Sequence, residues 1–134
     1  MNIFTVMDKK IIITGCILGL TAVLLGAFGA HGLKNLVDNT AIESFNTGVR
    51  YQMYHSFFLL LVSQFAFLSP THKRNLWIAV VIGVLLFSGS IYLLVVDTIF
   101  GFDARSIAFI TPIGGLLLIL AWTFVLVYTY KAKF

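Results

Sequence analysis

The last long uncharged stretch of the chain, residues 106–130, reads SIAFITPIGGLLLILAWTFVLVYTY. Its 25 residues exceed the roughly 20 that an α-helix needs to cross about 30 Å of hydrocarbon. A transmembrane β-strand would alternate polar and apolar residues over about ten positions, whereas this stretch is apolar on all sides. The stretch therefore predicts a transmembrane α-helix.

Three further uncharged stretches precede it, at residues 11–30, 51–70 and 75–96. The whole chain is 60% hydrophobic and 10% charged, whereas soluble domains are about 45–50% apolar and about 25% charged. This composition excludes an ordinary soluble enzyme domain. The sequence predicts an all-α membrane protein, a four-transmembrane-helix bundle in a single domain over 1–134, with helices at about 11–31, 50–70, 75–96 and 106–130.

The connection between the first two stretches has a helical pattern of its own. Ile42, Phe45 and Val49 recur at spacings of three and four, while Glu43 and Arg50 lie away from that stripe. We expect a short amphipathic interfacial helix at about 40–49 that runs into the second transmembrane helix. Asn39 or Thr40 would cap its start.

The basic residues divide unevenly between the two sides of such a bundle. Four crossings put six Lys and Arg residues on the side of the termini and three on the other. The positive-inside rule then predicts both termini in the cytoplasm. No basic run exceeds two residues, so the net charge of +4 does not indicate a nucleic-acid partner.

The first stretch also resembles two kinds of cleaved leader. Lys9 and Lys10 before an apolar run are typical of a signal peptide, but an apolar core of 20 residues exceeds the 7–15 of such leaders. The residues around Cys16 resemble a lipoprotein cleavage box, but only three apolar residues separate the box from Lys10. We expect the helix to be retained and Cys16 to pack as a small buried residue.

Small residues line one face of this first helix at spacings of three and four. Such a stripe allows two backbones to approach closely in a membrane, and a narrow ligand groove is the alternative interpretation. The residues predicted to serve helix packing are Gly15, Gly19, Ala22, Gly26 and Ala30.

Most of the unusual polar residues fall in the outer half of the predicted bundle. His31 is either a helix-capping or interface residue or a proton carrier, and Arg50 is expected to have a fixed acidic or carbonyl partner. Ser88-Gly89-Ser90 and Thr111-Pro112 are expected to break the third and fourth helices. The candidate functional cluster comprises His31, Arg50, His55, Ser88, Ser90, Asp97, Asp103, Arg105 and Thr111.

No recognisable catalytic or metal-binding motif accompanies these residues. An enzyme would need His31 or His55 as general base and Arg50 as an anion clamp, and no sequence feature specifies a substrate. Neither histidine has the spacing or the neighbours of a metal ligand. We therefore expect a protein that is not an enzyme, with no metal and no cofactor.

Four ordered motifs resemble one known family. They are Gly26-Ala27-Phe28-Gly29-Ala30-His31-Gly32-Leu33, Tyr51-Gln52-Met53-Tyr54-His55, Phe87-Ser88-Gly89-Ser90 and Thr111-Pro112-Ile113-Gly114-Gly115. Together they are similar to the small membrane proteins of the domain of unknown function 423 family, which is related to the transmembrane protein 256 group of animals. The resemblance implies a multi-pass protein of the bacterial inner membrane and assigns no activity.

Two functions remain open at this point. The first is a non-enzymatic accessory or interaction subunit, whose partners are the lipid bilayer and other membrane protein subunits or a second copy of itself. The alternative is a protein that binds or transports a lipid, quinone or small solute in an outer-leaflet pocket lined by His31, Arg50 and His55.

Overall fold

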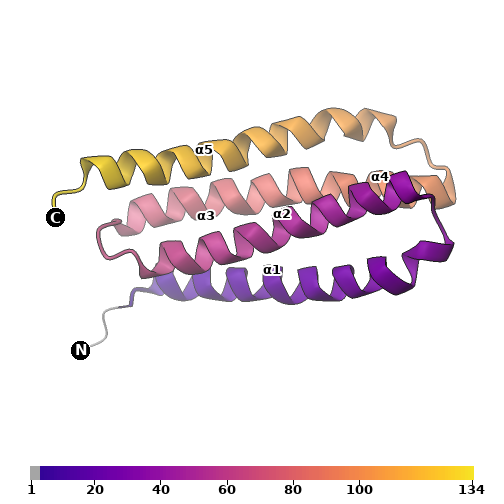
Figure 1. Cartoon of the computed structure of the whole chain (residues 1–134). Helices are drawn as coiled ribbons and strands as arrows, with labels where there is room; N and C mark the ends of the chain where they lie inside the picture. The colour runs from indigo at the N-terminus through magenta and orange to yellow at the C-terminus, as the bar shows by residue number, and fades with distance from the viewer. Residues whose placement is uncertain (1–3) are drawn as a thin grey trace.

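The computed structural model of the chain describes residues 4–134, and every regular element in that range is helical. A single π-helical turn, η2, joins α3 to α4, so the bundle consists of four long antiparallel rods (Figure 1). The elements are α1 (Val6–His31), η1 (Leu33–Asn35), α2 (Asn39–Gln64), α3 (Pro70–Val84), η2 (Leu85–Gly89), α4 (Ser90–Phe100), η3 (Arg105–Phe109) and α5 (Ile110–Lys131).

The two ends of the bundle differ in what they contain. The start of α1, the α2–α3 connection and the end of α5 lie together, and we call this the terminal end (Figure 1). The connections at 32–38 and 101–104 lie at the opposite end, which we call the loop end.

Three of the four rods are long and apolar enough to cross a membrane: Val6–Asn35, Pro70–Phe100 and Arg105–Lys131. The all-helical prediction is therefore confirmed, but α2 is not among these candidate spans. The reason is its composition, because Arg50, Gln52 and His55 interrupt the apolar sequence of α2.

Capping residues fix where the helices begin, and they correct the predicted boundaries. Asp38 caps α2, accepting a hydrogen bond from the Ala41 amide at 2.8 Å, so neither Asn39 nor Thr40 is the cap. The expected interfacial helix at 40–49 is the first part of one continuous α2. Ser69 caps α3 with Pro70 in its first turn, so residues 65–69 are a connection and not the end of a helix at 50–70.

The contact between α1 and α2 rests on small residues. A Cβ on Gly15 or Gly19 would meet Leu60 or Ser56 of α2 at 2.9–3.0 Å. Ala22 is buried on the same face, and Gly26 faces Val49. The prediction that Ala30 lies on this packing face is wrong, because Ala30 is exposed. Gly29 packs against the ring of Phe45 instead.

A second close contact joins α5 to the α3–α4 rod. A Cβ on Gly114 would overlap the backbone nitrogen of Phe87, and one on Gly83 would lie 2.7 Å from Leu118. Pro112 does not kink the fourth rod, because it lies in the first turn of α5, where a missing N–H leaves no bond unmade.

Two apolar clusters form the interior. The smaller one lies at the loop end and contains Leu33, Phe45 and Val95. The larger one fills the middle and the terminal end, and its buried members are Ile11, Phe58, Leu59, Val62, Leu68, Leu76, Val80, Val84, Leu118 and Ala121.

Candidate functional site: interhelical polar bonds and a cleft at the loop end

The predicted polar cluster is not a single site. His31 is exposed at the end of α1. Asp103 and Arg105 form an exposed ion pair at 2.7 Å, and the hydrogen bond from Arg105 lowers the pKa of the Asp103 carboxyl. Asp97 accepts a hydrogen bond from the Ala104 amide at 3.1 Å and so holds the α4–η3 connection.

Three hydroxyl residues of the cluster serve contacts between helices. Ser88, in the π-turn, donates to the carbonyl of Gly48 at 2.7 Å and joins η2 to α2. Ser90 and Thr111 share a hydrogen bond of 2.5 Å between α4 and α5. The irregular turn predicted at Ser88–Ser90 thus exists, and its hydroxyl groups bond to neighbouring helices.

Gln52 connects three helices, a role that no sequence pattern indicates. Its amide nitrogen donates to the carbonyl of Leu18 at 3.0 Å and to Thr21 Oγ1 at 2.7 Å, both on α1. Its amide oxygen accepts from the hydroxyl of Tyr92, on α4, at 2.8 Å. All polar atoms of this buried side chain are therefore used within the bundle.

His55 is 3% exposed and lies between α2 and α5. Its Nδ1 is 2.7 Å from the carbonyl of Tyr51, and its Nε2 is 3.2 Å from the indole nitrogen of Trp122. A carbonyl and an indole N–H fix the neutral tautomer with the proton on Nδ1, because the first only accepts and the second only donates. His55 borders a groove of about 280 Å³ whose other lining residues are Tyr51, Phe87, Gly115, Leu118, Ile119 and Trp122.

The expectation that Arg50 has a fixed acidic or carbonyl partner within the bundle is wrong. Its guanidinium is exposed and donates to Thr47 Oγ1 at 3.1 Å, one turn earlier on the same helix. Within residues 4–134 the ion pairs are Lys73–Asp8 and Arg105–Asp103. Because α2 begins at Asn39, Arg50 lies about 16 Å along it and not at its start. Arg50 makes no ion pair with any carboxylate of residues 4–134.

The buried ion pair of the bundle is elsewhere, at the terminal end. Lys73 Nζ lies 2.6 Å from Asp8 Oδ1 and donates to the carbonyl of Ser63 at 2.9 Å. Both charged side chains are almost fully buried. Asp8 also closes a capping box with Thr5 at the start of α1. The spacing Thr5-x-x-Asp8 was a usable signal for this helix start, but the partner of Asp8 is remote in sequence.

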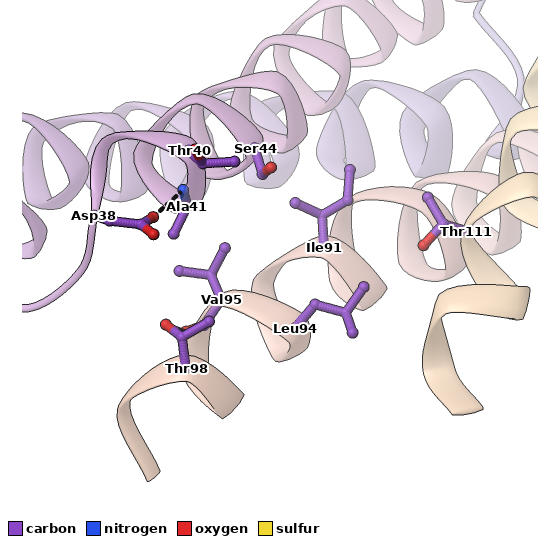
Figure 2. Close-up of a pocket in the computed structure, with 9 residues that line it drawn as sticks. All are labelled: Asp38, Thr40, Ala41, Ser44, Ile91, Leu94, Val95, Thr98 and Thr111. Atoms are coloured by element: carbon purple, nitrogen blue, oxygen red, sulfur yellow. Dashed lines mark hydrogen bonds between the residues drawn. The ribbon is translucent and has the colours of Figure 1, made fainter. Parts of the chain in front are cut away.

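A cleft at the loop end lies close to part of the predicted cluster. Its volume is about 390 Å³, and it lies between the first turns of α2, the α4 helix and the start of α5 (Figure 2). Asp38, Thr40, Ser44, Thr98 and Thr111 supply polar groups, and Ile91, Leu94 and Val95 form an apolar wall. Of the predicted cluster, only Thr111 lines it; His31, Arg50 and His55 do not.

Four antiparallel helical rods, three of them apolar enough to span a bilayer, define a small helical membrane protein. The chain belongs to the family described as protein of unknown function (DUF423), whose model matches residues 25–115. This confirms the resemblance of the four sequence motifs.

Relatives similar over nearly their whole length are named UPF0382 membrane proteins. One from Haemophilus influenzae is 36% identical, covering 95% of this chain and 98% of its own. YwdK from Bacillus subtilis is 40% identical, covering 92% of this chain and 98% of its own. A relative from Schizosaccharomyces pombe is 37% identical, covering 81% of this chain and 92% of its own. No solved structure matches the chain.

Proposed function

We propose that the chain crosses the bacterial inner membrane four times, with both termini in the cytoplasm. The start of α1 and the end of α5 lie at the same end of the bundle (Figure 1), as an even number of crossings requires. Lys9, Lys10, Arg74, Lys131 and Lys133 are exposed at that end, which supports a cytoplasmic orientation.

Within this topology, we propose that the protein is a non-enzymatic interaction subunit that docks on another membrane protein through α2. One observation carries this proposal: Glu43, Thr47 and Arg50 lie on the outward side of α2, and two of them, Glu43 and Arg50, are exposed. The contacts of Val49 with Gly26 and of Gly48 with Tyr92 place Arg50 at a height where the outward residues of the neighbouring helices, Leu24 and Leu93, are apolar.

The depth of Arg50 follows from its neighbours. An apolar crossing of about 20 residues that begins after Lys10 ends near Gly29, and Gly29 packs against Phe45. Arg50 is one and a half turns further along α2, about 7.5 Å inside that boundary. A charged residue in this region is costly and is typically satisfied by a polar partner or by reaching back to the headgroups.

A different polypeptide fits this surface better than a second copy does. Two copies related by a two-fold axis along the membrane normal would place their α2 helices at equal heights. Arg50 would then face Arg50 and Glu43 would face Glu43, and like charges in contact oppose association. We therefore propose a partner with the complementary order of charges, an acidic or carbonyl-rich group opposite Arg50.

Site-specific photocrosslinking in native membranes tests this proposal. A photoreactive residue at Thr47 is expected to give a protein adduct, whereas one at the lipid-facing position Leu20 is expected to give none. Arg50→Glu should abolish the adduct, and Arg50→Lys should keep it. Lys34→Glu makes the same charge change at the same end of the bundle and should leave the adduct unchanged. Identical results at Thr47 and Leu20 would refute docking through α2.

The cleft in Figure 2 favours a second candidate, binding of an amphiphile at the loop end. Hydroxyl groups and the Asp38 carboxylate stand opposite an apolar wall, which suits a hydrogen-bond-donating or cationic head group with an apolar tail. Leu94→Trp would fill the cleft and should remove bound amphiphile from the purified protein, detected by native mass spectrometry. Unchanged retention with a correctly folded variant would exclude this cleft as the binding site.

A further inference from the structure

A third concavity, at the terminal end, has a different chemistry. Its volume is about 360 Å³, and it lies between the start of α3 and the end of α5. Phe67, His72, Tyr128, Lys131 and Ala132 line it. The apolar sequence of α5 ends at Tyr130, so this pocket lies at the height where hydrocarbon gives way to lipid headgroups.

The pocket offers two nitrogen groups suited to an anion. Lys131 carries a positive charge and lines the opening. The Nδ1 atom of His72 is buried and has no hydrogen-bond partner among residues 4–134, although buried polar atoms are nearly always bonded. The His72 ring is held in place by stacking on Tyr128, with ring centroids 4.0 Å apart. A ligand that accepts a hydrogen bond would satisfy the unpaired atom.

The electrostatics of this end favour a negative ligand. His72 lies in the first turn of α3, where the helix dipole is positive. Asp8 is the acidic residue that the sequence places at this end, and Lys73 neutralises it at 2.6 Å. Lys9, Lys10, Arg74 and Lys133 therefore add positive charge that no Asp or Glu side chain at this end balances.

We propose that this pocket binds the phosphate group of an anionic phospholipid. Lys131 pairs with the phosphate and His72 donates from Nδ1 to one of its oxygens, while Phe67 and Tyr128 pack beside the glycerol and the upper acyl chain. The proposal concerns the end of the molecule opposite the α2 docking surface and the loop-end cleft. It stands independently of the function proposed above.

Titration of the purified full chain in detergent tests the site. Phosphatidylglycerol is expected to raise the melting temperature of the wild type more than phosphatidylcholine does. In Lys131→Gln and in His72→Phe, which keeps the ring stacked on Tyr128 but removes Nδ1, the apparent affinity for phosphatidylglycerol should fall about tenfold. Lys133→Gln removes the same charge two residues away, outside the pocket, and should bind as the wild type does.

The controls separate the site from general attraction and from free phosphate. Equal weakening by Lys133→Gln and Lys131→Gln, or equal effects of the two lipids on the wild type, would overturn the proposal in favour of diffuse charge attraction. If inorganic phosphate alone reproduces the full effect, the lipid assignment is overturned. Melting temperatures without added lipid establish that each variant is folded.

Discussion

At the scale of single residues, His55 has both ring nitrogens engaged. Tyr51 accepts from Nδ1, and Trp122 donates to Nε2. Protonation of Nε2 would turn it into a donor facing the donor of Trp122, so the contact between α2 and α5 would be lost. In this arrangement His55 is a structural bridge, and no proton-accepting atom of its ring is free for a substrate.

The roles of His55 and Arg50 predict a clear ranking of variants. His55→Ala and Trp122→Phe should each lower the stability of the bundle by about 1–3 kcal/mol, because each leaves a polar partner without its bond. Arg50→Lys should leave it unchanged, since Arg50 is exposed. Thermal unfolding in detergent measures the stability of each variant. A loss of stability for Arg50→Lys equal to that for His55→Ala would contradict the predicted ranking.

The buried pair of Lys73 and Asp8 gives a second prediction at this scale. Lys73→Met leaves Asp8 buried without its cation, which should cost about 3–5 kcal/mol. The double variant Lys73→Met, Asp8→Leu should recover most of that loss, because no charge then stays buried. Lys133→Met, which changes an exposed lysine, is the control. A double variant as unstable as Lys73→Met alone would count against a buried pair.

Charged residues were also where the sequence misled most. Lys73 and Asp8 look like ordinary flanking charges, and only the folded chain brings residues 65 positions apart into one buried pair. Arg50 is expected to be buried because a 20-residue uncharged stretch follows it, yet α2 begins at Asn39 and places Arg50 on its outward side. A charged residue marks where a helix meets water only when its side chain faces water. The sequence alone does not tell which way a side chain faces.

At the scale of elements, Gly114 is the position with the least room. A Cβ there would overlap the backbone nitrogen of Phe87, whereas one on Gly115 would meet the Phe87 ring at an ordinary 3.5 Å. Gly114→Ala should therefore separate α5 from the α3–α4 rod and destabilise the bundle by about 1–3 kcal/mol or more.

Gly115→Ala is the matched control for that prediction, because it makes the same change one residue along the same helix. It should leave the melting temperature in detergent nearly unchanged. Equal and small losses from both variants would show that the two rods do not depend on this backbone contact.

The helices themselves were largely predictable, since each of the four uncharged stretches overlaps one of the four rods. Periodicity also revealed that residues 40–49 are helical. The helix ends were less predictable, because the Ser69-Pro70 start signal lies inside a stretch judged only by its lack of charge. The contacts between the rods, such as Gln52 with Tyr92, depend on which faces meet and could not be inferred from one chain.

At the scale of the whole molecule, the account depends on α2 crossing the membrane, although it is not among the apolar candidate spans. Its outward side changes from Glu43 and Arg50 to Tyr54, Phe57 and Leu61. We interpret this as the change from the surface proposed to face a partner to a surface that faces hydrocarbon. A three-crossing chain would instead place its termini on opposite sides.

Cysteine labelling in intact cells tests this most directly. In a Cys16→Ala background, which contains no other cysteine, single cysteines are introduced at exposed positions: Leu36→Cys and Phe102→Cys at the loop end, and Ala66→Cys and Lys133→Cys at the terminal end. A membrane-impermeant maleimide should label the loop-end pair in intact cells and the terminal-end pair only after permeabilisation. If Leu36→Cys and Ala66→Cys are instead labelled alike, α2 does not cross the membrane, and the four-crossing account is contradicted.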